Sequence, residues 1–516
     1  MTDWNESLYT FGYCLTKDPE RIIRQIPEIT GWRREAAGAF TLLVHPAQRY
    51  HRISTENAVW ILVGHACNPF TMEKDETDIL RRLSGLPFGS EEYRDYFDQL
   101  TGVFFFAVIR PDSVTACCDC AGMLGANYAL INGQPCFSAY SQLIADAYAL
   151  KEDLYVTKLK KSRFFHWYGW YLPGDLTPYA EVKRIVPNTE VTVGKTVSVF
   201  RFYPRKPYRE CSAAEYEQQT AQIGRILYNS LKLTTEKWER PAISLTGGTD
   251  SKTTLACAAD LQKRFRYFSY ISLPREQTDA YAARDICKAL GLRHTVYQVD
   301  PNPGSYPDYP TVSRLLERHY SYLGKANPND ICKRISLKEQ IDFDVEVKSW
   351  VSEVGRASRY EKYRKTSFPK EIRPRMLTSM YKIFVFDRAS ALRTDKKNRE
   401  YLDKTGLADA IRRTNYPWPE FFVWEIVFGG WGGLALTGEH MLTNEITVPY
   451  NNRVLLDLML RVPLEKRMHD RLHKDVMNRM DPRIEALGIH VINGNETKKR
   501  ALAERFYFDI HNLLPW

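Results

Sequence analysis

A short apolar run followed by paired glycines and hydroxyl side chains, at residues 242–252, constrains this chain more than any other stretch. Residues 242–245 have the length and apolarity of a buried strand, and residues 253–263 have the composition of a helix. Between them, Gly247 and Gly248 lack a Cβ atom, so the backbone can turn sharply and approach a ligand closely. A strand, a glycine turn and a helix in this order leave backbone N–H groups unpaired at the helix N-terminus, where a phosphate binds favourably.

The same turn carries three hydroxyl groups and one carboxylate. The hydroxyls stand beside the free N–H groups, and the carboxylate of Asp250 is placed where a Mg²⁺ ion that accompanies phosphates would bind. The alternative is an ordinary turn in which Asp250 and Ser251 only cap the helix. The order of strand, turn and helix favours the phosphate site. Its predicted ligand-binding residues are Leu245, Thr246, Gly247, Gly248, Thr249, Asp250 and Ser251, with Asp250 as the metal ligand.

Two better-known phosphate-binding motifs do not fit this stretch. A Walker A loop requires glycine directly before its Lys-[Ser/Thr] pair, but Ser251 stands there in front of Lys252. A Rossmann G-x-G-x-x-G turn is absent from the stretch. Residues 430–435 do fit G-x-G-x-x-A, but no βαβ unit with a ribose-binding acid follows them. Their glycines predict close packing of a helix instead.

The composition sets the broad class of protein. The chain has 516 residues, of which 44% are hydrophobic and 26% are charged, so we expect a soluble globular protein of several domains with an ample core. A net charge of +10 and a pI of about 8.9 suit a polyanionic ligand such as ATP and do not require a nucleic acid partner. The ten cysteines have no regular spacing and predict buried free thiols. A polar start and the lack of a membrane-length apolar stretch predict a cytoplasmic protein without membrane association.

The chain changes character at about residue 205. Before it, short β-type runs are punctuated by turns, and Asn132-Gly133 is a hairpin signal, so we expect an α+β region with antiparallel pairing. After it, strand-like and helix-like segments alternate, which predicts a parallel sheet with a nucleotide at the carboxyl ends of its strands. The predicted strands are 40–44, 59–63, 103–109, 113–117, 242–245, 267–271 and 294–299, and the predicted helices include 76–83, 253–263 and 279–290.

Residues 246–251 resemble the S-G-G-x-D-S loop of the N-type ATP pyrophosphatases, enzymes that cleave ATP between the α and β phosphates. In the first part of the chain, residues 59–68 resemble the strand that carries N-G-E-I-Y-N in the asparagine synthetase family, and residues 102–107 resemble its G-M-F-A-F-A strand. The resemblance implies an α/β protein of two domains. Residues 1–205 would form a glutaminase-like, N-terminal-nucleophile (Ntn-type) α+β sandwich. Residues 206–516 would form a parallel-sheet ATP pyrophosphatase (PP-loop synthetase) domain with extra helices.

This resemblance also assigns roles to residues outside the loop. It implies ATP and Mg²⁺ as cofactors, with Ile271 and Ser272 near the adenine. Glu353 falls on the family's catalytic glutamate, where a carboxylate would take a proton from an attacking amine. The alternative for Glu353 is a solvated helix start, with its side chain paired to Arg356. Lys474 matches the lysine that neutralises charge on the pyrophosphate, and the alternative is an exposed lysine on a polar helix.

The chain departs from the family at three places. Arg356 falls where the family has its second magnesium-binding aspartate, so either the register differs or the site has changed and Arg356 contacts phosphate directly. Thr2 stands in place of the nucleophilic cysteine, and Val63-Gly64 stands in place of the Asn-Gly of the oxyanion hole. Loss of the thiolate and of one donor predicts an inactive glutaminase domain kept as a scaffold. In this respect the chain resembles β-lactam synthetase, carbapenam synthetase and the lasso-peptide cyclases.

The prediction is therefore an ATP-dependent amide-forming ligase. A substrate carboxylate attacks the α-phosphorus of ATP to give an acyl-adenylate and pyrophosphate, and ammonia or a substrate amine then displaces AMP. Two alternatives remain: a glutamine-dependent amidotransferase that uses Thr2, and a nucleotide-binding pseudoenzyme, which Arg356 suggests. The residues do not identify the carboxylate, which is a small molecule or a peptide, nor do they decide between a monomer and a homodimer.

Overall fold

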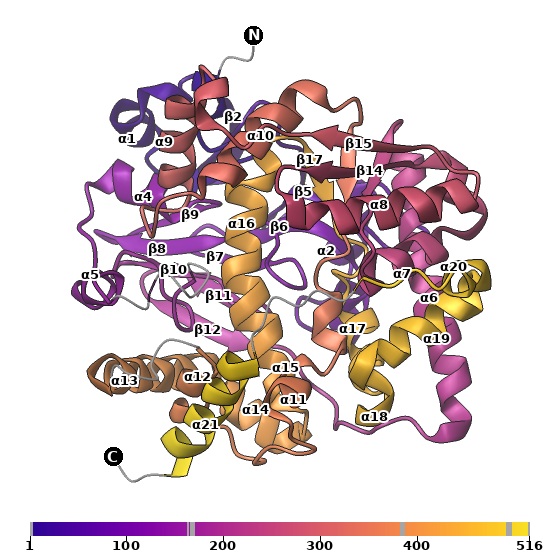
Figure 1. The fold of residues 1–516 in the computed structure, drawn as a ribbon. Helices are drawn as coiled ribbons and strands as arrows, with labels where there is room; N and C mark the ends of the chain where they lie inside the picture. The colour runs from indigo at the N-terminus through magenta and orange to yellow at the C-terminus, as the bar shows by residue number, and fades with distance from the viewer. Residues whose placement is uncertain (1–3, 163–164, 166–170, 382–387, 492–497, 514–516) are drawn as a thin grey trace.

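Two antiparallel sheets and one parallel sheet form the framework of the protein (Figure 1). The computed structural model describes residues 4–162, 165, 171–381, 388–491 and 498–513. The antiparallel sheets belong to the N-terminal part of the chain and the parallel sheet to the C-terminal part, which confirms the predicted α/β class.

The first antiparallel sheet has six strands in the order β10-β8-β9-β1-β3-β2. They are β1 (Tyr13–Thr16), β2 (Arg33–Ala37), β3 (Phe40–Val44), β8 (Asn127–Ile131), β9 (Gln134–Ser138) and β10 (Val182–Arg184). The hairpin predicted at Asn132-Gly133 joins β8 to β9. Asn132 and Gly133 have φ angles of 51° and 72°, as a tight two-residue hairpin turn requires.

The second antiparallel sheet also has six strands, in the order β12-β11-β7-β6-β5-β4. They are β4 (Tyr50–Ser54), β5 (Val59–Cys67), β6 (Thr101–Ile109), β7 (Val114–Cys118), β11 (Thr189–Val193) and β12 (Val197–Arg201). Every residue of β6 is buried, and Phe105 of β6 stacks on Tyr13 of β1 with ring centroids 4.6 Å apart. The two sheets therefore pack face to face, as the predicted sandwich requires. The helices of this part are α1 (Pro19–Gln25), α2 (Glu76–Ser84), α3 (Glu91–Asp98), α4 (Ser141–Tyr148) and α5 (Leu154–Lys160).

The C-terminal sheet has five strands in the order β15-β14-β13-β16-β17, and all four pairings are parallel. The strands are β13 (Pro241–Ser244), β14 (Arg266–Ile271), β15 (His294–Gln298), β16 (Val345–Val347) and β17 (Glu445–Thr447). Their carboxyl ends lie at one edge, where open α/β sheets bind ligands. Two predicted helices begin earlier than expected, because Gly248 already caps α7 and Pro274 already opens α8.

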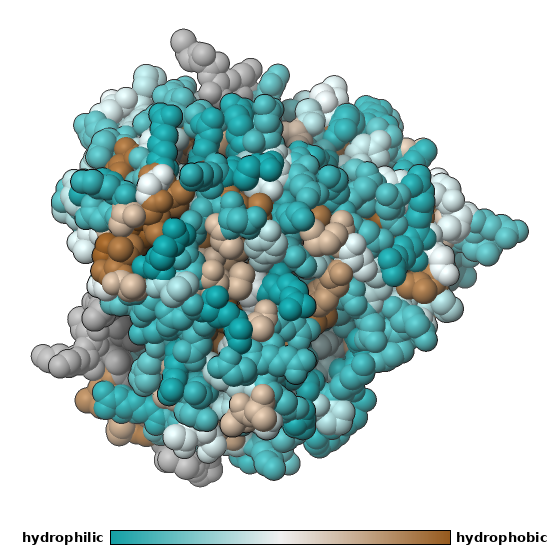
Figure 2. Space-filling model, turned by 90° about the vertical axis from the view of Figure 1, so that its right-hand side faces the viewer, coloured by the Kyte–Doolittle hydropathy of each residue, from teal (hydrophilic) through white to brown (hydrophobic). Residues whose placement is uncertain are grey.

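Helices surround the parallel sheet and account for most of the remaining chain (Figure 1). The face that carries α6 and α19 is largely hydrophilic (Figure 2). The helices are α6 (Ala213–Lys237), α7 (Thr249–Ala258), α8 (Pro274–Ala289), α9 (Tyr309–His319), α10 (Pro328–Gln340), α11 (Ser358–Tyr363), α12 (Pro374–Met380), α13 (Arg388–Thr405), α14 (Leu407–Thr414), α15 (Trp418–Phe421), α16 (Gly433–Gly438), α17 (Arg453–Leu460), α18 (Leu464–Arg467), α19 (Arg471–Met480), α20 (Pro482–Ala486) and α21 (Lys498–Leu513).

A helical run from Trp418 to Leu442 passes through the middle of the molecule (Figure 1). It is long and apolar enough to cross a membrane, but 78% of its most apolar window is buried inside the fold, which accounts for its composition. A Cβ atom on Gly433 would lie 2.1 Å from the carbonyl oxygen of Gly122, and one on Gly432 would lie 3.1 Å from Cε of Met123. The close packing predicted for these glycines is confirmed.

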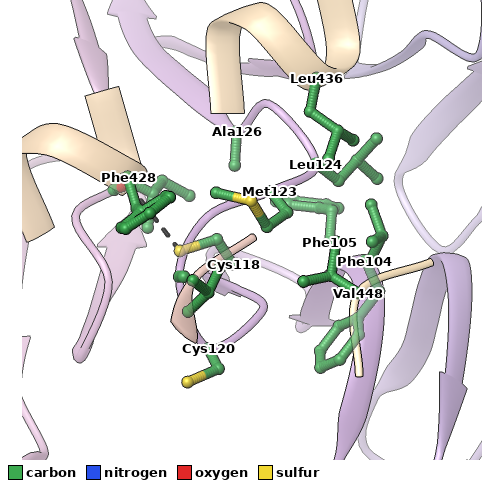
Figure 3. Close-up of a cluster of buried hydrophobic side chains, with 14 of the residues drawn as sticks. Phe104, Phe105, Cys118, Cys120, Met123, Leu124, Ala126, Phe428, Leu436 and Val448 are labelled. Carbon is green, nitrogen blue, oxygen red and sulfur yellow. Dashed lines mark hydrogen bonds between the residues drawn. The ribbon is translucent and has the colours of Figure 1, made fainter. Parts of the chain in front are cut away.

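The hydrophobic core is shared between the two parts of the chain. Phe428 and Leu436 of the central helical run gather with side chains of the antiparallel sheets and their connections, among them Phe104, Cys118 and Met123 (Figure 3). The predicted boundary at residues 205/206 lies between β12 and α6 and stays a prediction.

Candidate nucleotide-binding site

The glycine and hydroxyl loop follows β13, which lies in the middle of the parallel sheet between β14 and β16. Side chains of the loop hold its turn closed. The N–H of Thr246 donates to Oγ of Ser251 (3.1 Å), and the N–H of Gly248 donates to Oγ1 of Thr246 (3.1 Å). Gly248 is then the N-cap of α7, with no side chain to cap the first N–H groups of that helix. This arrangement leaves the start of α7 able to receive an anion.

Gly247 is required for a reason that the sequence did not reveal. A Cβ atom there would lie 2.2 Å from Cγ2 of Val491 and 3.0 Å from Cβ of Ala282. The residues before Val491 also contact α7, since Nζ of Lys252 donates to the carbonyl oxygen of Ile489 (2.8 Å). The glycine therefore admits another part of the chain against the loop.

Asp250, in the first turn of α7, contacts side chains from another segment of the chain. Oγ of Ser352 donates to its Oδ1 (2.7 Å), and Nη1 of Arg356 donates to its Oδ2 (2.5 Å). Ser352 and Arg356 belong to the turn that follows β16, so the structure brings the predicted Glu353 segment to the predicted loop across adjacent strands.

Arg356 connects Asp250 to a second carboxylate. Its Nε donates to Oδ1 of Asp470 (2.8 Å), and its Nη2 lies 2.6 Å from the same oxygen. Oδ2 of Asp470 accepts a hydrogen bond from Oγ1 of Thr249 (3.0 Å). Asp470 precedes α19 and has a left-handed backbone (φ 59°), as does His469 before it (φ 53°), and this kink turns the chain just before α19. The result is an Asp250–Arg356–Asp470 bridge in front of α7.

Glu353 lies beside this bridge. Burial and, secondly, the negative charge of Asp250 raise the pKa of its carboxyl to about 7, well above the ordinary value near 4.5. Its partner Ser352 is close, with 3.5 Å between Oγ and Oε2. A carboxyl with a pKa near neutrality can accept or release a proton at physiological pH, which fits the predicted role of a base. The role itself stays a prediction.

Lys474 is half-buried on α19, and α19 packs directly on α7. The positive charge of Lys474 is close enough to lower the pKa of Lys252, although burial is the larger cause of that shift. The structure therefore places Lys474 in the surroundings of the loop rather than on a remote polar face. Contact with a pyrophosphate stays a prediction.

The two residues predicted near the adenine stand at the carboxyl end of β14, beside β13. Both are buried. The polar groups of Ser272 already have partners, since its N–H donates to Oε2 of Glu276 (2.8 Å) and its hydroxyl donates to Asn329. Ile271 and Ser272 therefore lie at the edge of the sheet where a nucleotide is expected, and their contact with adenine stays a prediction.

Sequence reasoning missed three residues at this site: Ser352, Asp470 and His473. His473 is 2% exposed, and its Nε2 lies 3.6 Å from Oδ1 of Asp250. Neither of its ring nitrogens has a hydrogen-bond partner among the described residues, and burial lowers its pKa. For His473 the sequence offered its four-residue spacing from His469, but the kink at residues 469 and 470 places His469 outside α19, so the two histidines do not share a helix.

The donors around Asp250 do not fit a Mg²⁺ ion held by the protein. Mg²⁺ is bound through one or two carboxylates with waters and phosphates, but both oxygens of Asp250 already accept a hydrogen bond, and one of the donors is a guanidinium whose positive charge opposes a second cation at the same carboxylate. Within the described part of the chain, no three His, Cys, Asp or Glu side chains gather as a metal site. The predicted metal role of Asp250 therefore lacks support in the geometry.

The residues that were compared with a glutaminase belong to the second antiparallel sheet. Val63 is fully buried in β5. Gly64 has a φ of 102°, and a Cβ atom on it would lie 2.2 Å from the carbonyl oxygen of Val103. In this chain the pair serves the packing of β5 on β6. Thr2 lies outside the described residues, and β1 begins only at Tyr13.

The fold and site define an α/β protein with a phosphate-type loop at the carboxyl edge of a parallel sheet. A family model described as Asparagine synthase matches residues 222–331, a segment that contains the loop and β14. The match shows that this segment is similar to that family, and it leaves the rest of the chain unassigned. Among curated proteins, no sequence matches the chain.

Solved structures give weaker similarities. One, the allosteric regulatory enzyme of purine biosynthesis, is 11% identical with a TM-score of 0.25 and covers 61% of this chain and 74% of its own. Another, glutamine phosphoribosylpyrophosphate amidotransferase from B. subtilis complexed with ADP and GMP, is 9% identical with a TM-score of 0.20 and covers 70% and 73%. Similarities with TM-scores this low carry no conclusion about the chain.

Proposed function

We propose that this protein is an ATP-dependent ligase that forms an amide bond. An oxygen of the substrate carboxylate attacks the α-phosphorus of ATP, the bond to the β-phosphate oxygen breaks, and pyrophosphate leaves. An amine or ammonia then attacks the carbonyl carbon of the acyl-adenylate, and AMP leaves. Adenylation is needed because a free carboxylate is a poor electrophile, whereas AMP is a good leaving group.

Residues of the site take separate parts in this proposal. The loop from Thr246 to Ser251 and the first N–H groups of α7 would cradle the phosphates. Glu353 would take the proton that the attacking amine loses, and Lys474 would stabilise the negative charge that builds on the pyrophosphate. Mg²⁺ enters the proposal only as the counterion that ATP carries on its phosphates.

The observation that carries the proposal is the meeting of Glu353 with the loop. A carboxyl with a pKa of about 7 lies beside Asp250, although the two residues follow different strands of the sheet, β16 and β13. A base and a phosphate-type loop at one edge of a parallel sheet fit a reaction in which phosphate departs and an amine attacks. The family match to residues 222–331 supports the use of ATP.

An inactive glutaminase is part of this proposal, and so is a cytoplasmic location. Val63 and Gly64 have no side-chain donor for an oxyanion, so ammonia from glutamine would lack one of the usual stabilising contacts. The relation to β-lactam synthetase, carbapenam synthetase and the lasso-peptide cyclases is proposed on the same ground. The nucleophile that attacks the acyl-adenylate is then a substrate amine or free ammonia, and not ammonia released from glutamine within the protein.

ATP–pyrophosphate exchange tests the proposal. Purified protein is incubated with ATP, labelled pyrophosphate and pools of candidate carboxylates, and each pool that supports exchange is divided until one acid remains. Asp250→Asn is expected to abolish exchange, and Asp409→Asn, which removes only an exposed ion pair with Arg412, is expected to keep it. Release of ADP and phosphate in place of pyrophosphate would exclude adenylation.

A nucleotide-binding pseudoenzyme is the second candidate, and the Asp250–Arg356 ion pair favours it, because this pair stands where the family would hold a metal. ATP binding without exchange for any carboxylate pool would support it. The third candidate, a glutamine-dependent amidotransferase, depends on Thr2; glutaminase activity that Thr2→Ala abolishes would support it.

A further inference from the structure

We propose that Arg356 takes the place of a protein-bound metal ion at Asp250, and that its guanidinium binds the pyrophosphate part of the nucleotide directly. This inference rests on the proposed function, because it assigns a ligand to the same site. The family resemblance implies a metal at this position, but the chain supplies a permanent cation of its own, the guanidinium of Arg356.

The geometry holds the guanidinium in one place. Asp250 contacts Nη1, and Asp470 contacts both Nε and Nη2, at distances of 2.5 to 2.8 Å. Asp470 is itself fixed by Thr249, the first residue of α7. Two carboxylates thus orient one planar cation over the start of a helix whose first N–H groups also point outward.

Two N–H groups of Arg356 have no partner in the part of the chain that the structure describes. A guanidinium has five N–H groups, and the contacts with Asp250 and Asp470 use three, which leaves one on Nη1 and one on Nη2. The side chain of Arg356 is 26% exposed, so an incoming anion can reach part of it. Paired N–H groups of a guanidinium match two oxygens of a phosphate, which a hydrated point charge does not.

Cations and carboxylates both surround the loop. Arg356, Lys252 and Lys474 are positively charged, and the carboxylates of Asp250, Asp470 and Glu485 lie near them. Glu353 adds less than a full negative charge near neutral pH, because its pKa is about 7. Pyrophosphate can therefore approach without a divalent ion bound to Asp250, whereas a divalent ion would first have to displace the guanidinium.

A purely structural bridge between the turn after β16 and α19 is the competing explanation for Arg356. Both explanations predict that loss of Arg356 lowers stability. Only direct binding predicts that Arg356 governs pyrophosphate affinity when no divalent metal is present, and that a carboxylate at this position restores a need for the metal.

Calorimetric titration with inorganic pyrophosphate and with ATP, each in EDTA and in Mg²⁺, separates the two. Wild type is expected to bind pyrophosphate in EDTA. Arg356→Gln is expected to weaken that binding by about tenfold or more, the loss expected for one charge-assisted contact. Arg356→Lys is expected to recover only part of it, because an ammonium cannot bridge both carboxylates and present a fork. Arg356→Asp is expected to bind pyrophosphate only when Mg²⁺ is present.

Arg318→Gln is the matched control, because Arg318 also bridges two carboxylates, Glu28 and Asp146, and its side chain is 22% exposed. It is expected to bind pyrophosphate as wild type does, and thermal unfolding confirms that every variant is folded. Binding by wild type that requires Mg²⁺ and does not change in Arg356→Gln would overturn the inference and leave the proposed function intact. Wild type that binds neither ATP nor pyrophosphate under either condition would overturn both.

Discussion

The surroundings of Glu353 bring the pKa of its carboxyl close to neutral pH, and this pKa determines how the reaction should respond to pH. Burial disfavours its charged form, and the carboxylate of Asp250 adds repulsion, so the pKa rises to about 7. A base works only when it is deprotonated. We therefore expect the capture of the acyl-adenylate by amine to be slow below pH 7 and to become faster as the pH rises through about 7. Rapid-quench measurement of amide formation across pH checks this.

Glu353→Gln separates catalysis from binding. The amine step is expected to slow by about 10²- to 10⁴-fold, the range for loss of a general base, and its dependence on pH near 7 should disappear. ATP–pyrophosphate exchange should remain, since adenylation does not use this carboxyl. Equal loss of exchange and of amine capture would mean that Glu353 only supports the shape of the site.

At the scale of packed elements, a buried ion pair holds the central helical run, residues Trp418–Leu442, in place. Glu425 is fully buried, and its two carboxylate oxygens accept from Nη1 and Nη2 of Arg201 at 2.6 and 2.9 Å. The hydroxyl of Tyr401 on α13 donates to Oε2 of Glu425 (2.8 Å), and Asn188 donates to Oε1 (3.0 Å). One side chain thus ties the helical run to β12, to α13 and to the connection before β11.

Glu425→Ala is expected to lower the free energy of unfolding by about 3–5 kcal/mol, because it leaves the guanidinium of Arg201 buried without its partner. Urea denaturation measures this. Glu425→Gln keeps the shape and part of the hydrogen bonding, so its cost should be smaller. Glu400→Ala removes only an exposed ion pair with Lys397 and should change the unfolding free energy by less than about 1 kcal/mol. A loss in Glu425→Ala no larger than in this control would contradict the role of the pair.

At the scale of the whole molecule, the two parts of the chain are joined by polar contacts as well as by the core. The side-chain amide of Asn451 donates to the carbonyl oxygen of Gly102 (2.6 Å) and to Asp119 (2.8 Å), and its oxygen accepts from the N–H of Ala121 (2.8 Å). Asn451 is fully buried between the parallel sheet and the second antiparallel sheet. Separation of the parts would expose these groups together with the apolar side chains in Figure 3.

The predicted boundary can be tested on this basis. Residues 1–205 expressed alone are expected to aggregate, because their face toward the central helical run would be exposed. The same residues co-expressed with residues 206–516 are expected to copurify and to elute from gel filtration at the size of the intact chain. A soluble, cooperatively folded fragment 1–205 would show that the shared core is dispensable for that part.

The sequence predicted the features that depend on neighbours along the chain. The turn at Asn132-Gly133 and the buried strand at 40–44 were placed correctly, because positive φ angles and short-range apolar patterns are local properties. The loop before α7 was recognised for the same reason. The start of α7 was placed too late, since capping by Gly248 was not considered.

The chain by itself thus determined antiparallel pairing in its first part, a parallel sheet in its second part, the loop and the residue types that could serve a nucleotide. Only the tertiary structure decided what surrounds Asp250. Arg356 lies 106 residues further along the chain, and Asp470 lies 114 residues beyond Arg356. Charges interact through space, and the distance between such residues is set by the sheet and by the packing of α19 on α7, which no short stretch of sequence specifies.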